Sequence, residues 1–220
     1  MGKIYVPSKG PDDWRELLAD RDKHWKPKYS AHALAHCWEK ANGLPVEISH
    51  LFAPQFSIVE LLLAIPEYKV ALPGGGRESQ NDLFCLLKAD GQLMALMVEG
   101  KVDEPFDRSV GDWLVDASPG KRERMSFLCQ TLGLSEPVPP DIRYQLLHRT
   151  ASALITAKRF GAGKAAMIVH SFSPSRKWLA DYQAFVRLWG IETEPSRLEA
   201  VKVPDGRDLL LGWASGTLPG

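Results

Sequence analysis

Apolar residues in the middle of the chain form runs with the length of buried strands. Two such runs, 81–88 and 93–102, flank Asp90-Gly91, a residue pair that favours a tight type I′ hairpin turn. A third run at 164–172 has the length of another buried strand, and 208–216 predicts a last one. The pattern therefore predicts a sheet built around a central hairpin.

Other segments carry apolar residues at helical spacing. A helix is predicted to begin at Ser30 and to stop at Asn42-Gly43, and a second is predicted over 57–65, closed by Pro66. The most regular helical pattern runs over 141–160, and further helices are expected at 121–133 and 178–190. Helices and strands alternate in this order, so an α/β fold with a central mixed sheet flanked by helices is expected.

Composition is that of an ordinary globular protein, with 220 residues of which 45% are hydrophobic and 25% are charged. A single domain is expected, with a helical part at 1–56, a core at 57–172, and a helix and strand packing on the core at 173–220. No run approaches the roughly 18 apolar residues of a membrane span, and the first residues lack a secretion signal, so no membrane partner and a cytoplasmic location are expected. The three cysteines have no zinc-site spacing.

The hairpin register brings charged residues together. If Asp90-Gly91 form the turn, counting back along both strands places Asp82 opposite Glu99, with Lys101 on the same face. The rest of the hairpin is apolar on both faces, which indicates two central strands covered by helices on each side. Opposed carboxylates destabilise a sheet, so these two acids need a neutralising group.

Two arrangements satisfy that need. Mg²⁺ binds one or two carboxylates and keeps waters for a phosphate, and Lys101 beside it would activate water or stabilise charge on phosphoryl oxygens. Alternatively, Lys101 pairs with Glu99 and Asp82 in a structural cluster of salt bridges. The spacing alone does not separate these alternatives.

The pattern Asp82, then Glu99-Gly100-Lys101 on the adjacent strand, resembles the metal-dependent PD-(D/E)XK nuclease superfamily, which has a restriction-endonuclease-like core of order α-β-β-β-α-β. The resemblance covers 57–172 and implies that Asp82 and Glu99 bind Mg²⁺ or Mn²⁺ while Lys101 assists the attacking water. It implies hydrolysis of phosphodiester bonds, with DNA as the partner. The third core strand is not identifiable in 103–120, and Asn81 stands where the superfamily has proline.

The resemblance also implies roles for residues on the two helices predicted in the core. Glu60, in the predicted first helix, would donate a further acid to the metal, although an ordinary exposed helical position is the simpler explanation. Gln145 and Arg149 would bind the phosphate backbone from 141–160, and solvent exposure equally explains the polar stripe that they form with His148 and Ser152. The strings VEGKVDEPF and RYQLLHRTASA also resemble an uncharacterised bacterial family, which supplies no activity.

Two other functions fit the same residues. A catalytically inactive binding or assembly module would keep the charged cluster for stability, and the balance of 27 basic against 27 acidic residues favours it, because nucleic-acid enzymes gain affinity from phosphate contacts. A hydrolase of a small phosphorylated metabolite or nucleotide is the other alternative. The oligomeric state stays open, a homodimer being one option.

Overall fold

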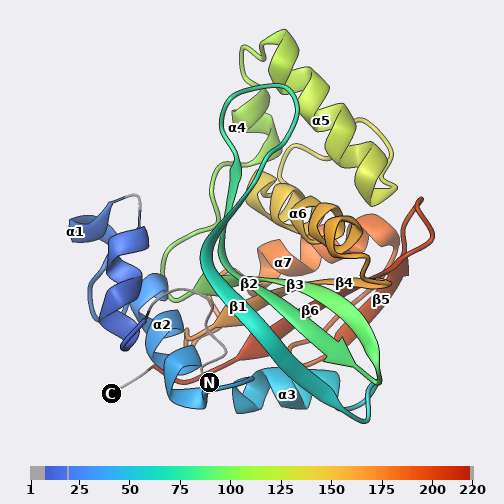
Figure 1. Ribbon diagram of the computed structural model, residues 1–220. Coiled ribbons are helices and arrows are strands. Elements are labelled where there is room, and N and C mark those ends of the chain that lie inside the picture. Colours follow the sequence, from blue (N-terminus) through green and yellow to red (C-terminus); the bar gives the residue numbers. More distant parts are fainter. Residues whose placement is uncertain (1–7, 19, 219–220) are drawn as a thin grey trace.

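Six strands form one mixed sheet at the centre of the protein (Figure 1). The computed structural model describes residues 8–18 and 20–218, so the ends of the predicted parts 1–56 and 173–220 lie outside the described residues. The strands lie in the spatial order β1-β2-β3-β4-β6-β5. Their bounds are β1 (Val59–Val70), β2 (Ser79–Ala89), β3 (Gln92–Lys101), β4 (Lys164–Ser171), β5 (Leu198–Lys202) and β6 (Asp208–Ser215).

Helices cover both faces of this sheet, which confirms the α/β class (Figure 1). Alternate residues of the hairpin point to opposite layers: Leu83 and Leu96 pack in one buried cluster, Phe84 and Met97 in the other. The cluster that contains Leu83 is covered by helices of the N-terminal part, and the cluster that contains Phe84 is covered by helices that follow the hairpin in sequence. The helices are η1 (Pro11–Leu17), α1 (Arg21–His24), α2 (Ser30–Ala41), α3 (Val46–Phe52), α4 (Val110–Leu114), α5 (Pro119–Leu132), α6 (Tyr144–Phe160), α7 (Leu179–Val186) and η2 (Arg187–Trp189).

The central hairpin has the predicted register. Ala89 pairs with Gln92, and the antiparallel pairing continues without a shift to Leu83 and Val98. Asp90 and Gly91 both have left-handed backbone angles, with φ of 44° and 85°. Positive φ at both central residues is the requirement of a type I′ turn, so the turn prediction is confirmed.

The helix predicted over 57–65 is wrong, because this segment begins strand β1. The strand pairs with β2 along its length, from Val59 opposite Ala89 to Val70 opposite Ser79. The carboxylate of Asp90 accepts hydrogen bonds from the amides of Ser57 and Ile58, at 3.2 and 2.8 Å, and so holds the start of the strand. Pro66 lies inside β1, where it is tolerated because β1 is an edge strand.

This correction also accounts for the strand that was not identifiable in 103–120. If α4 and α5 are treated as an insertion between β3 and α6, the elements from α3 to β4 follow the order α-β-β-β-α-β, with α3 in place of the helix predicted over 57–65. The segment 103–120 instead contains α4 and the first two residues of α5. Strand β4 is parallel to β3, and β6 is parallel to β4.

Most of the other predicted elements are confirmed, but helices α1 and α3 were not predicted, and α6 and β5 also differ from the prediction. Helix α6 begins at Tyr144 rather than at 141, because Arg143 forms a bridge with Ser109 and the Tyr144 amide donates to the Arg108 carbonyl. Strand β5 was not predicted; it is a short edge strand that depends on pairing with β6. Among the described residues, no helix combines the length and the apolar character that a bilayer crossing requires.

Candidate functional site

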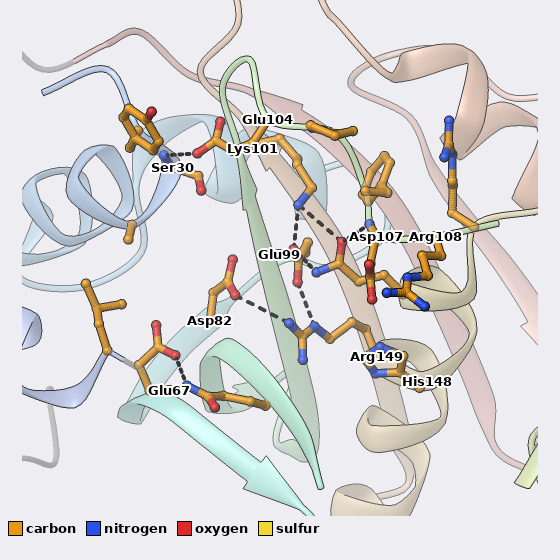
Figure 2. A pocket seen from close by; sticks show the side chains of 18 residues that line it. Ser30, Glu67, Asp82, Glu99, Lys101, Glu104, Asp107, Arg108, His148 and Arg149 are labelled. Carbon is orange, nitrogen blue, oxygen red and sulfur yellow. Dashed lines mark hydrogen bonds and ion pairs between the residues drawn. The ribbon is translucent and has the colours of Figure 1, made fainter. Parts of the chain in front are cut away.

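Asp82, Glu99 and Lys101 converge where β2 begins and β3 ends, as the hairpin register predicted (Figure 2). The site lies on the face of the sheet that α6 covers. The side chains of Glu99 and Lys101 are almost fully buried, at 2% and 6% exposure, whereas Asp82 keeps 22%. The three groups therefore share one partly enclosed environment.

Glu99 is the centre of the hydrogen-bond network. Its Oε1 accepts from Lys101 Nζ and from Gln145 Nε2, both at 2.7 Å, and its Oε2 accepts from Arg149 Nε at 2.7 Å. Burial alone would raise the pKa of Glu99, but the two adjacent cations outweigh burial and lower that pKa. Glu99 is therefore a fully paired carboxylate.

Asp82 is less well compensated. Its Oδ2 accepts from the Gly100 amide at 2.8 Å, and its Oδ1 lies 3.6 Å from Arg149 Nη2. Burial and the charge of Glu99 raise the pKa of Asp82 to about 7, against the opposing effect of Arg149. The carboxyl of Asp82 is therefore protonated more readily than an ordinary aspartate.

Glu67 is a third acid in the site, and the sequence analysis missed it. It lies in β1 between the pairs Pro66–Leu83 and Tyr68–Asn81, and so opposite Asp82. Its Oε2 accepts from Gln80 Nε2 at 2.6 Å, and it forms no ion pair with any described residue. Burial and the nearby Asp82 raise the pKa of Glu67 to about 8.

Glu60 does not join the site. It is exposed and pairs across β1 and β2 with Lys88, near the hairpin turn and at the opposite end of the strands from Asp82. The helical interpretation of 57–65 pointed to Glu60 as the further acid. An interpretation as an antiparallel strand would have pointed to Glu67, since only that residue falls opposite Asp82.

Helix α6 directs its polar stripe toward the sheet rather than toward solvent. Arg149 and Ser152 are buried, and His148 Nδ1 lies 2.8 Å from Ser79 Oγ. Gln145 is one turn before Arg149, and its Oε1 accepts from Lys101 Nζ at 3.3 Å and from the Asp107 amide at 3.2 Å. The site therefore explains the stripe, including both predicted residues of this helix.

A pocket of about 860 Å³ opens onto these groups. Its walls come from the start of α2, the loop 104–108 and α6. Glu104 ties two of these walls together, because its carboxylate accepts from the amide of Ser30 at 2.6 Å (Figure 2). The same carboxylate accepts from the amide of Val102 at 3.1 Å. The carboxylates and Lys101 are therefore accessible to a small ligand from one side.

A family model, "Domain of unknown function (DUF6946)", matches residues 7–218. The chain belongs to this family. Searches among curated proteins and among solved structures give no match.

The DUF6946 site contains the ligand type that divalent cations prefer, but the structure does not bring all three carboxylates within 4.8 Å of one another; among the described residues, Cys37, Glu47 and His170 form the group that meets that distance. Glu67, Asp82 and Glu99 offer carboxylate oxygens, the ligands that Mg²⁺ and Mn²⁺ prefer. Burial is the largest cause of the raised pKa values of Glu67 and Asp82, and repulsion from a neighbouring acid adds to it, from Asp82 on Glu67 and from Glu99 on Asp82. A bound cation would relieve that repulsion.

A second cluster in the DUF6946 chain joins Cys37, Glu47 and His170, whose ligand atoms lie within 4.8 Å of one another. His170 Nε2 is 2.8 Å from Glu47 Oε1, and the Trp38 indole N–H donates to His170 Nδ1 at 3.2 Å. Because an indole can only donate, Nδ1 must be the unprotonated nitrogen and Nε2 must carry the proton. Nε2 therefore has no lone pair for a metal, and this cluster fits a structural hydrogen-bond chain.

Proposed function

We propose that this protein hydrolyses phosphodiester bonds, with DNA as substrate and Mg²⁺ or Mn²⁺ as cofactor. The observation that carries the proposal is the facing pair of Glu67 and Asp82, next to Glu99 and Lys101, at the base of a pocket. The α-β-β-β-α-β order around the site supports it, because the resemblance to PD-(D/E)XK nucleases implies that order.

In this proposal the three carboxylates would hold the cation, which requires their oxygens to come closer together than they are in the structure. When bound, the cation supplies Lewis acidity to a phosphoryl oxygen and makes water a better nucleophile. The Lys101 ammonium lies between Glu99 Oε1 and the Phe106 ring, whose centroid is 4.8 Å away, so its charge is held in a fixed position. From there it stabilises the negative charge that develops on the phosphate during hydrolysis.

Gln145 and Arg149 position these groups. Gln145 contacts both Lys101 and Glu99, which keeps the ammonium aligned with its carboxylate. The side chain of Arg149 is 10% exposed and is already paired with both Glu99 and Asp82. The proposal therefore gives Arg149 the task of orienting the acids instead of the phosphate contact that the resemblance implied.

A second candidate is a binding or assembly module without catalysis. The observation that favours it is the pairing of Glu99 with both Lys101 and Arg149 at 2.7 Å, since these cations neutralise that acid without a metal. In this candidate the cluster stabilises the sheet, and the pocket binds a partner without chemical change.

Cleavage assays separate the two candidates. Purified protein is incubated with plasmid, linear duplex and single-stranded DNA in Mg²⁺ or Mn²⁺, and Lys101→Met is compared with Lys88→Met, an exposed lysine on β2. We expect the wild type and Lys88→Met to cleave DNA, and Lys101→Met to lose roughly 10²-fold or more of the rate. Absence of cleavage together with absence of Mg²⁺ binding by calorimetry would reject the nuclease and favour the module.

A further inference from the structure

We infer that the substrate enters the pocket as an unpaired single strand, with Arg108 binding its phosphate and Tyr29 stacking on a base. This inference rests on the proposed function and names its substrate class. Tyr29 and Arg108 both line the pocket but come from different walls, Tyr29 from the start of α2 and Arg108 from the loop after β3. A strand lying between them would reach the carboxylates.

The charge of the pocket argues against a continuous duplex. Five acidic and four basic residues line it, which leaves no positive surplus for a polyanion: Glu67, Asp82, Glu99, Glu104, Asp107, and Lys101, Arg108, Arg143, Arg149. The whole chain is equally balanced, with 27 residues of each sign. A duplex presents one negative charge for about every 1.7 Å, and duplex binding depends on many phosphate contacts. A single phosphate group needs only one available cation.

Arg108 is that cation. Lys101 is buried and paired with Glu99 beside the reacting group, Arg149 is paired with Glu99 and Asp82, and Arg143 Nε pairs with Asp181 at 3.0 Å. Arg108 is exposed and forms no ion pair with any residue that the structure describes. Its guanidinium is therefore free to bind a phosphate oxygen in the fork geometry that arginine favours.

Tyr29 supplies an aromatic surface at the same pocket. It is one of the few large hydrophobic residues left exposed, at 38%, and its ring makes no aromatic contact with a described residue. Its backbone is held on both sides, since its amide donates to the Lys26 carbonyl and its carbonyl accepts from the Ala33 amide. Stacking on such a ring requires an unpaired base, because bases in a duplex already stack on each other.

The size of the pocket agrees with this substrate. A volume of about 860 Å³ lies inside the range of roughly 300–1,000 Å³ found for sites that enclose small ligands. A ligand of nucleotide size fits such a space. A duplex, whose major groove alone is about 12 Å wide, would lie across the mouth without delivering its phosphate to Lys101.

Binding measurements test the inference without depending on cleavage. A fluorescein-labelled single-stranded DNA oligonucleotide and a blunt duplex of the same sequence are titrated with the Lys101→Met protein in Mg²⁺, and anisotropy is recorded. We expect the single strand to bind at least about tenfold more tightly than the duplex. Arg108→Ala and Tyr29→Ala should each weaken single-strand binding by about tenfold, as loss of one stacked base or one phosphate contact does. Arg122→Ala, an exposed arginine on α5 outside the pocket, should leave binding unchanged.

Failure of this inference differs from failure of the proposed function. Equal binding of the two DNA forms, no binding of either, or insensitivity to both pocket substitutions overturns the single-strand inference. Wild-type cleavage of covalently closed duplex plasmid as fast as of single-stranded DNA would also overturn it, while leaving the nuclease proposal standing. If the wild-type protein neither cleaves DNA nor binds Mg²⁺, the nuclease proposal itself is overturned.

Discussion

The guanidinium of Arg149 spans two acids, with Nε 2.7 Å from Glu99 Oε2 and Nη2 3.6 Å from Asp82 Oδ1. Replacing it by methionine keeps the length of the side chain and removes the charge. Arg149→Met should therefore lower the free energy of unfolding by about 3–5 kcal/mol, the usual effect of breaking a buried ion pair on one side. Urea unfolding measures this loss.

The matched control is Lys158→Met, on the exposed face of the same helix, which should change the free energy of unfolding by less than about 0.5 kcal/mol. A loss below about 1 kcal/mol in Arg149→Met would show that the two acids do not depend on this cation.

The facing acids should make the metal-free protein less stable as pH rises. The pKa values of Glu67 and Asp82 are raised to about 8 and about 7, so the folded state binds more protons than the unfolded state above about pH 4. Their contribution to stability is complete at lower pH and is lost as pH rises through 7 and 8. Chemical unfolding in EDTA between pH 5 and pH 9 should show this loss, and Glu67→Gln should reduce its slope. An unchanged slope in Glu67→Gln would contradict the assignment.

Mg²⁺ should restore the stability that the acids remove. At a concentration 100 times its Kd, a ligand that binds only the folded state adds about 2.7 kcal/mol. Asp82→Asn should raise the metal-free melting temperature at pH 8 and abolish the Mg²⁺-induced shift, because it removes both repulsion and a ligand. Glu60→Gln, an exposed acid on β1, should keep the shift. A fall in the metal-free melting temperature of Asp82→Asn would instead indicate a salt-bridge cluster that needs Asp82.

His170 should stay neutral with its proton on Nε2. Burial lowers the pKa of His170 although Glu47 opposes that effect, and Trp38 donates to Nδ1. Because its pKa in the folded state lies below that of an unfolded histidine, about 6.5, its contribution to stability is lost as pH falls below that value. Nitrogen-15 NMR should show an unprotonated Nδ1 and a protonated Nε2. Addition of Zn²⁺ should leave both resonances in place, and a shift of Nε2 would contradict the tautomer.

The sequence around the turn determined the central hairpin, and the hairpin brought Asp82, Glu99 and Lys101 of the site together. A two-residue turn at Asp90-Gly91 allows one register, so simple counting along two strands placed Asp82 opposite Glu99. The apolar residues on both faces of the hairpin likewise predicted helices on both faces of the sheet, and the buried clusters confirm this. These inferences needed only contacts between residues that are close in sequence.

The tertiary structure decided what depends on distant partners. Residues 57–65 suit either a helix or a strand, and pairing with β2 selected the strand, which moved the third acid from Glu60 to Glu67. From the sequence, the polar stripe of α6 could face either solvent or a site. Packing of α6 against β3 buries Arg149 and so places the stripe in the site. A sequence pattern records which face of an element is polar, but the free energy that selects its partner comes from burial and pairing across long separations, which no local pattern encodes.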